Sequence, residues 1–151
     1  GKEIVLNTAH RYNWVQIAGS ISHPEKGKII DISADTNKNL GIEDSSVLLY
    51  PADNYGEPEL LRVIIKRENP DAIMMITDPR YFIWLFQMEN EIRKKIPITY
   101  LNIWDSPFPY PLWNKEFYKS CDLLMSISKQ TKNINKTVLE TENIPVIDLD
   151  K

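Results

Sequence analysis

Residues 101–113 read LNIWDSPFPYPLW, and the interpretation of the whole chain starts from this stretch. An apolar run predicts a buried strand over 98–103, and the following loop holds three prolines, two tryptophans and Asp105. Proline fixes φ and lacks a backbone donor, so neither a helix nor an interior strand can continue there. Because ligand sites in open α/β folds lie beyond the carboxyl ends of strands, this stiff aromatic loop suits a flat or sugar-like ligand. The alternative is a rigid crossover whose aromatic rings only cover the end of the sheet.

The composition is that of an ordinary globular chain. Its 151 residues are 42% hydrophobic, which is enough for a sizeable core. The 18 basic and 21 acidic residues give a formal net charge of -3, which disfavours nucleic acid, since its binding depends on Lys and Arg contacts to phosphate. Cys121 is the only cysteine, so no internal disulfide forms and a reducing, cytoplasmic location is expected. No apolar run approaches the ~20 residues that span a bilayer, and no secretory signal is visible.

Apolar runs and spacings predict the secondary structure. In the first half of the chain we expect a strand over 3–7, a polar turn over 8–13, a helix over 14–21, strands over 28–34 and 47–50 separated by a polar loop, and a helix over 60–68. In the second half we expect strands over 72–77, 97–103, 122–127 and 144–147. The helices between these strands are expected from 79 to about 95, over 112–120 (a short one) and over 128–140. The residues expected to be buried are Ile4, Leu6, Ile73, Met75, Ile98, Leu101, Leu124 and Ile127.

Strands that alternate with helices imply right-handed crossovers and a parallel sheet covered on both faces. We therefore expect residues 1–151 to form one open, doubly wound α/β domain of Rossmann type. Its sheet would be mainly parallel, with about six or seven strands and helices on both faces.

Polar and aromatic side chains follow several of the predicted strands. Asp105 and Asp78 are the candidate catalytic residues, each as a general base or as a group that holds a sugar hydroxyl. The simpler role for Asp78 is a helix N-cap ahead of Pro79, worth roughly 1 kcal/mol. The candidates for substrate binding are His10, Arg11, Tyr12, Trp14, Arg80, Trp104 and Ser128. The alternatives are a solvated turn for His10 and Arg11, and a helix cap for Ser128.

Other chemistries lack their motifs. No G-x-G-x-x-G follows the first predicted strand, and neither a Walker sequence nor a G-x-S-x-G elbow is present, so we expect no nicotinamide or flavin cofactor. His10 and His23 are too few and too far apart for a zinc site, and no metal is expected. Cys121 has no cationic neighbour that would make it reactive, so it is interpreted as a small buried hydrophobe.

Three segments carry a resemblance to a known family: NPDAIMMITD (69–78), IPITYLNIWDSPFP (96–109) and CDLLMSISKQT (121–131). They resemble the N-terminal domain of GT-B-type glycosyltransferases, most closely the family 4 group, and HRYNWVQIAGSI (10–21) resembles the first site loop and helix of that family. The resemblance covers nearly the whole chain through short, degenerate motifs. Many retaining members carry a histidine after the fifth strand, where this chain has Trp104 and Asp105, so no histidine role is carried over.

The resemblance implies that this chain binds the acceptor, a glycan or other small hydroxyl compound. A C-terminal domain would hold the nucleotide-sugar donor, and its glycine-rich loop and glutamate pair are absent from these residues. The chain alone is therefore expected to be inactive in sugar transfer. Peripheral membrane association through the acceptor is a further implication.

Two other classes stay open. One is a non-catalytic, Rossmann-like ligand-binding domain. The other is a divergent receiver-type regulatory domain, since PDAIMMITD (70–78) resembles a phosphorylation strand. A receiver needs an acidic pair after its first strand, where Asn7 and Thr8 stand, and a lysine after its fifth, where Trp104 and Asp105 stand.

Overall fold

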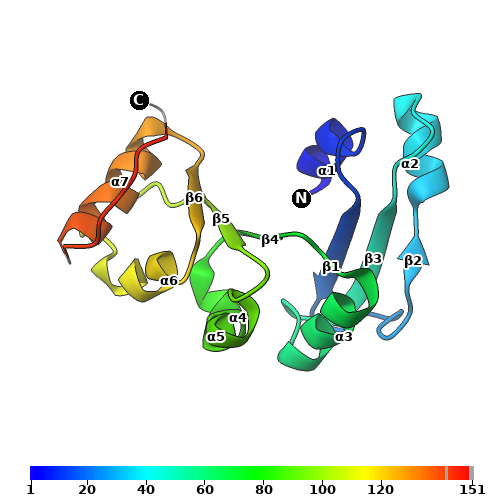
Figure 1. Cartoon of the computed structure of the whole chain (residues 1–151), viewed down its shortest axis with the longest axis horizontal. Coiled ribbons are helices and arrows are strands. Elements are labelled where there is room, and N and C mark those ends of the chain that lie inside the picture. The colour runs from blue at the N-terminus through cyan, green and yellow to red at the C-terminus, as the bar shows by residue number, and fades with distance from the viewer. Residues whose placement is uncertain (142, 150–151) are drawn as a thin grey trace. The chain divides into compact units, whose positions relative to one another are not determined.

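The computed structural model describes residues 1–141 and 143–149 and has a mixed α/β architecture. The contacts divide the chain into two compact units, Gly1–Glu68 and Asn69–Lys151. The strands of the described residues form two separate three-stranded sheets, one in each unit, rather than the single larger sheet that we expected (Figure 1). That the whole chain acts as one Rossmann-like domain stays a prediction.

The first unit holds a short sheet with the order β1-β3-β2. Its elements are α1 (Lys2–Thr8), β1 (Trp14–Ser20), β2 (Ile30–Asp31), α2 (Ser33–Leu40), β3 (Val47–Asp53) and α3 (Pro58–Glu68). β1 and β3 run parallel over seven residue pairs, and β2 is antiparallel to β3. The centre of its core is Val5, Ala9 and Val47, against which Trp14, Ile32 and Ile42 pack.

The first two predicted elements of this unit are of the wrong type. Residues 3–7 lie in α1 rather than in a strand, and residues 14–21 contain β1 rather than a helix. Periodicity alone does not separate a short apolar helix from a buried strand. Here the parallel ladder between β1 and β3 decides the outcome, because it pairs backbone groups along the whole of β1.

The rest of the first unit follows the predictions more closely. The strand at 47–50 and the helix at 60–68 are confirmed as β3 and α3. The predicted strand over 28–34 shrinks to the two residues of β2. The loop expected after it contains α2, which ends at Gly41 in the left-handed region with φ 66°. A residue without Cβ adopts that conformation at no steric cost, which explains the helix stop.

The second unit holds an all-parallel sheet with the order β4-β5-β6. Its elements are β4 (Ile73–Ile76), the 3₁₀ helix η1 (Pro79–Phe82), α4 (Ile83–Gln87), α5 (Glu89–Ile92), β5 (Ile98–Asn102), the 3₁₀ helix η2 (Leu112–Asn114), α6 (Lys115–Lys119), β6 (Leu123–Ser126) and α7 (Lys129–Glu140). The three predicted strands and the predicted helix over 128–140 are confirmed. α7 buries Ile134 and Val138.

Three predictions for this unit are wrong. The helix expected from 79 to about 95 is divided into η1, α4 and α5. The described residues of 144–147 form no strand. Met75 and Ile98 are buried as expected, but Ile127 is 56% exposed because β6 ends one residue earlier, at Ser126. Of the remaining expected core residues, Ile4, Leu6, Ile73, Leu101 and Leu124 are half-buried.

Candidate functional site

A pocket of about 270 Å³ lies at the carboxyl ends of β4 and β5, in the second unit. Both candidate catalytic residues and Trp104 line it. The lining residues are Thr77, Asp78, Tyr100, Asn102, Ile103, Trp104, Asp105 and Ser106. The carboxyl end of parallel strands is the usual place for a ligand in an open α/β sheet, so this pocket is the strongest candidate site.

Asp78 is held by Arg80 in two ways. Its Oδ1 accepts the backbone N–H of Arg80 at 2.9 Å, which makes Asp78 the N-cap of η1, as the sequence predicts. The Arg80 guanidinium also donates through Nε at 2.9 Å and through Nη2 at 2.5 Å. These side-chain hydrogen bonds lower the pKa of Asp78, although its partial burial acts in the opposite direction. Asp78 is therefore a paired anion and not a group poised to take a proton.

The same guanidinium lies against Trp104. The Cζ of Arg80 is 5.9 Å from the centre of the indole ring, within the range of a cation–π contact. Trp104 also meets Trp113 edge-on, with ring centroids 6.1 Å apart. Arg80 is thus placed at the pocket by Asp78 and Trp104 together, and its predicted contact with substrate stays a prediction.

Asp105 differs from Asp78 because its carboxylate has no partner among the described residues. Its side chain is exposed, whereas its backbone carbonyl accepts a hydrogen bond from the Gln130 amide. The carbonyl of Trp104 likewise accepts from the Thr131 hydroxyl at 2.9 Å. The first turn of α7 therefore holds the loop by its backbone and leaves the Asp105 carboxylate free at the pocket.

A fully buried amide forms the floor of the pocket. The Oδ1 of Asn102 accepts the backbone N–H of Trp104 at 2.9 Å, and its Nδ2 donates to the hydroxyl of Tyr118 at 2.9 Å and to Oδ1 of Asn135. The Tyr100 hydroxyl lies 3.1 Å from Asn102 and 2.8 Å from the carbonyl of Thr77. Burial raises the pKa of both tyrosines, so their hydroxyls stay protonated.

The sequence analysis did not identify this network. Its one visible signal is an asparagine within the apolar run that forms β5, where an amide without partners would be costly. The Thr77 end of the network is unusual as well, since Thr77 has φ 88°. Such a conformation is costly for a β-branched residue and persists only when its surroundings enforce it.

Ser128 acts as a helix cap rather than as a lining residue. Its Oγ accepts the backbone N–H of Thr131 at 3.1 Å, and it does not line the pocket. The proline-rich loop beyond the pocket carries further exposed rings. Phe108 is 76% exposed, its ring centroid lies 5.4 Å from that of Tyr110, and its peptide bond to Pro109 is cis.

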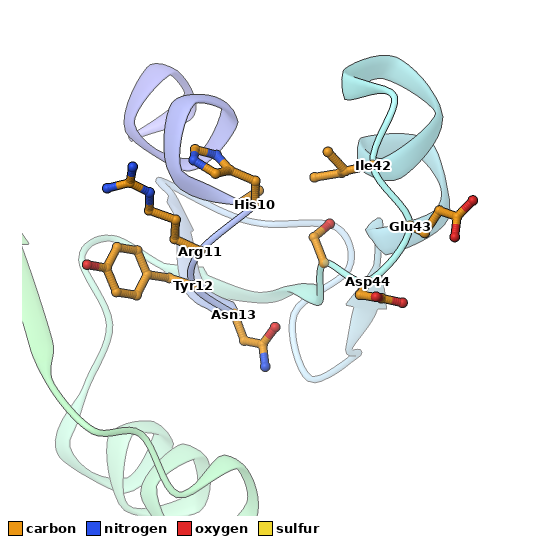
Figure 2. Close-up of a pocket in the computed structure, with 9 residues that line it drawn as sticks. His10, Arg11, Tyr12, Asn13, Ile42, Glu43 and Asp44 are labelled. Carbon is orange, nitrogen blue, oxygen red and sulfur yellow. The ribbon is translucent and has the colours of Figure 1, made fainter.

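A second pocket, of about 260 Å³, lies in the first unit between the turn after α1 and the loop after α2. His10, Arg11 and Tyr12 line it, as do Glu43 and Asp44. Figure 2 shows the first three side chains pointing to one side of the pocket, and Glu43 and Asp44 pointing to the other. The charged groups therefore do not converge on a common point within it.

The predicted location of His10, Arg11 and Tyr12 after the first strand is wrong. These residues precede β1, because the strand expected at 3–7 is α1, and they lie at the amino ends of β1 and β3. Trp14 does not line the pocket. It is the first residue of β1, and its Nε1 donates to the Thr8 hydroxyl at 3.0 Å.

A cluster of His23, Lys26 and Asp53 lies at the carboxyl ends of β1 and β3. The sequence analysis missed it because residues 14–21, which contain β1, were predicted to be a helix. Asp53 accepts the backbone N–H of His23 at 3.1 Å and the Lys26 ammonium at 2.8 Å. The hydrogen bond from Lys26 lowers the pKa of Asp53, and the same contact raises the pKa of Lys26. The ion pair is exposed to solvent, so it lies at the strand ends without forming a water-excluded site.

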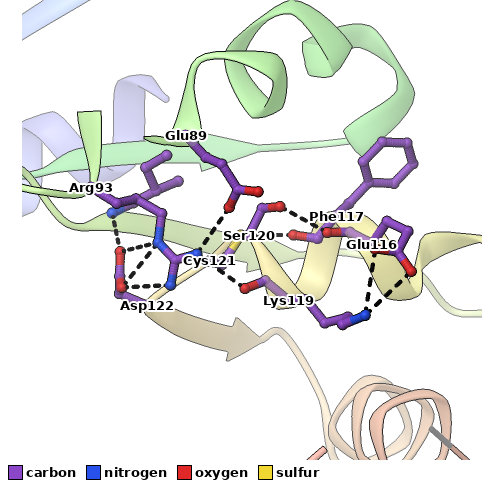
Figure 3. A network of polar contacts seen from close by, with 9 residues as sticks. Glu89, Arg93, Glu116, Phe117, Lys119, Ser120, Cys121 and Asp122 are labelled. Atoms are coloured by element: carbon purple, nitrogen blue, oxygen red, sulfur yellow. Dashed lines mark hydrogen bonds and ion pairs between the residues drawn. The ribbon is translucent and has the colours of Figure 1, made fainter. Parts of the chain in front are cut away.

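A polar network also lies at the amino ends of β5 and β6. Figure 3 shows Arg93 between two carboxylates, with its guanidinium 2.9 Å from both Glu89 and Asp122. Asp122 also accepts the backbone N–H of Ile98 at 2.8 Å. Burial of Asp122 would raise its pKa, but the hydrogen bonds from Arg93 and Ile98 outweigh that effect and lower it. The network joins α5, β5 and β6 and is structural.

Cys121 belongs to the same region. Burial raises the pKa of its thiol to about 12, and its Sγ donates to the carbonyl of Phe117 at 3.3 Å. A thiol in that state is protonated and unreactive at neutral pH. Within residues 1–141 and 143–149 no group of three or more His, Cys, Asp or Glu side chains is arranged to hold a metal ion.

Comparisons with known proteins identify no relative. No family model, no curated protein and no solved structure matches the chain. Among the described residues no helix combines the length and the apolarity needed to cross a bilayer.

Proposed function

We propose that this chain is the acceptor-binding part of a GT-B-type, family 4-like glycosyltransferase with a Rossmann-type fold. It would work in the cytoplasm, together with a C-terminal domain that binds the nucleotide-sugar. One observation carries the proposal: Asp78, Trp104 and Asp105 line one pocket at the carboxyl ends of two parallel strands. An aromatic face and a carboxylate at a strand exit suit a sugar, whose C–H faces pack on rings and whose hydroxyls donate to carboxylates.

The two carboxylates have different roles in this proposal. Asp78 is neutralised by Arg80 and orients the guanidinium beside Trp104. Asp105 holds the acceptor hydroxyl by a charge-assisted hydrogen bond. A general base needs partial desolvation to raise its proton affinity. Since Asp105 is exposed in this chain, the positioning role is favoured over the role of a base.

Binding to the isolated chain tests the proposal. Calorimetric titration with UDP- and GDP-sugars is expected to show no affinity better than about 1 mM, or about −4 kcal/mol, because the proposal assigns donor binding to a separate domain outside these residues. Simple sugars are expected to bind weakly and to shift the amide NMR signals of residues 103–106. Trp104→Ala should abolish those shifts, whereas Tyr12→Ala, an exposed ring in the other pocket, should leave them unchanged.

Kinetics of the two-domain enzyme tests the role of Asp105. Asp105→Asn keeps the shape and removes the charge. A loss of kcat/KM of about 100-fold or more indicates a general base, and a smaller loss indicates positioning. Wild-type kcat/KM in the folded variant would exclude both roles. Micromolar affinity of the isolated chain for a nucleotide-sugar would contradict the assignment of this part to the acceptor.

The same pocket also suits a binding domain without catalysis. The observation in its favour is that Asp78 is saturated by Arg80, while the exposed Asp105 carboxylate has no hydrogen-bond or ion-pair partner within residues 1–141 and 143–149. The two functions are separated by transfer activity in the longer chain, because a binding domain would retain the sugar contacts and show no turnover.

A further inference from the structure

We infer that the pocket at β4 and β5 selects neutral sugars and amino sugars as its ligands and rejects uronic acids and sugar phosphates. This inference rests on the proposed function and specifies its substrate class. It follows from two independent features of the eight lining residues, namely their charges and their hydrogen-bonding groups.

The charge of the lining is negative. Asp78 and Asp105 contribute two carboxylates, and no lysine, arginine or histidine is among the described lining residues. Arg80 stands beside the pocket and compensates Asp78 through a bidentate contact. Asp105 has no such partner among the described residues, so one negative charge remains uncompensated. An anionic ligand would meet a like charge at short range, which disfavours its binding.

All but one of the side-chain donors of the lining already donate within the described part of the chain. Both Nδ2 hydrogens of Asn102 are given to Tyr118 and Asn135. The Tyr100 hydroxyl donates to the Thr77 carbonyl, as its 2.8 Å distance indicates. The Trp104 indole donates to the Ser106 carbonyl at 3.0 Å, and the Ser106 hydroxyl lies 3.4 Å from the Phe108 carbonyl.

The lining side chains therefore leave the ligand mostly hydrogen-bond acceptors. The carboxylate of Asp105 is acceptor-only when ionised. Within residues 1–141 and 143–149, Thr77 supplies the one lining side-chain donor that forms no hydrogen bond. A ligand that donates hydrogen bonds, through hydroxyl or ammonium groups, therefore matches the pocket. An ionised carboxylate or phosphate mainly accepts hydrogen bonds, and it would lose its hydration with too few side-chain donors to replace it.

Three sugars with the same pyranose frame test the inference: glucosamine, glucose and glucuronate. They are titrated into the wild-type chain at about pH 6, where the amine is protonated and ordinary carboxylates are ionised. Binding is followed by the amide NMR signals of residues 103–106. We expect glucosamine to bind tightest and glucuronate weakest, with roughly tenfold between these two, the size of one charge-assisted hydrogen bond.

Asp105→Asn supplies an amide donor and removes the charge. The variant should therefore bind glucosamine and glucuronate with about equal affinity. The matched control is Asp71→Asn, which removes an exposed aspartate before β4, at the opposite end of that strand from the pocket. The control should keep the wild-type order. The amide spectrum of each variant reports that it is folded.

Each result has one meaning. Glucuronate bound as tightly as glucosamine would overturn the charge selection and leave sugar binding intact. A preference that persists in Asp105→Asn would also overturn it, because Asp105 would not be its source. No binding of any of the three sugars would overturn the proposed function itself.

Discussion

The two units close the carboxyl ends of their parallel strands in different ways. In the first unit an exposed ion pair between Lys26 and Asp53 lies beyond β1 and β3. In the second unit the buried amide of Asn102 forms three hydrogen bonds beneath the pocket, to Trp104, Tyr118 and Asn135. Water competes with an exposed ion pair but not with a buried amide network. The carboxyl ends of the strands in the second unit are therefore held in the more fixed shape, and these strand ends carry the candidate site.

Removing the buried amide should have the largest effect. Asn102→Ala leaves the groups around it without partners, so we expect a loss of roughly 3 kcal/mol in the free energy of unfolding. Urea denaturation measures this loss. The control is Asn133→Ala, the same substitution at an exposed position of α7, which should change stability by less than about 0.5 kcal/mol. Equal costs for the two variants would show that the network does not stabilise the second unit.

The second unit was largely predictable from its sequence because its signals are local. Asp78 before Pro79 and Ser128 before α7 are caps that act within three residues, and both are confirmed. The apolar runs of β4, β5 and β6 are each bounded by polar or turn-forming residues. Strand exits then place Asp78, Trp104 and Asp105 together, which follows from parallel geometry alone.

The first unit was predicted less well because its elements depend on distant partners. β1 pairs with β3, 33 residues further along the chain, and nothing within residues 14–21 indicates that pairing. The same holds for the floor of the candidate site. Asn102 meets Tyr118 and Asn135, which lie 16 and 33 residues away in sequence. Contacts of this kind are decided by packing, on which local patterns carry no information.

The backbones at the ends of β1 and β3 approach closely at Gly19, and a substitution there should have an intermediate effect on stability. A Cβ at Gly19 would lie 1.8 Å from the carbonyl oxygen of Asn54, whose backbone N–H donates to Ser20 at 2.5 Å. Gly19→Ala therefore forces the ends of β1 and β3 apart, at a cost of about 2 kcal/mol. Thermal unfolding followed by circular dichroism measures it. Ser20→Ala, at the exposed neighbouring position, serves as the control, and a Gly19→Ala variant as stable as that control would refute the close approach.

The ion pair of the first unit should have the smallest effect, and its pH dependence identifies it. The hydrogen bond from Lys26 lowers the pKa of Asp53, so the pair stabilises the fold above about pH 4, the ordinary value for Asp, and loses that contribution as pH falls through the lowered value. The hydrogen bond to Asp53 raises the pKa of Lys26, so the contribution is complete below about pH 10 and is lost as pH rises through the raised value.

A double-mutant cycle of Lys26→Met and Asp53→Asn isolates the coupling between the two side chains from their other contacts. We expect a coupling that is smaller than the effect of Asn102→Ala, present between about pH 4 and 10, and largely screened in about 1 M salt. A coupling that resists salt, or one that matches the buried network in size, would mean that the strand ends of the first unit are as firmly closed as those of the second, and the contrast between the two units would fail.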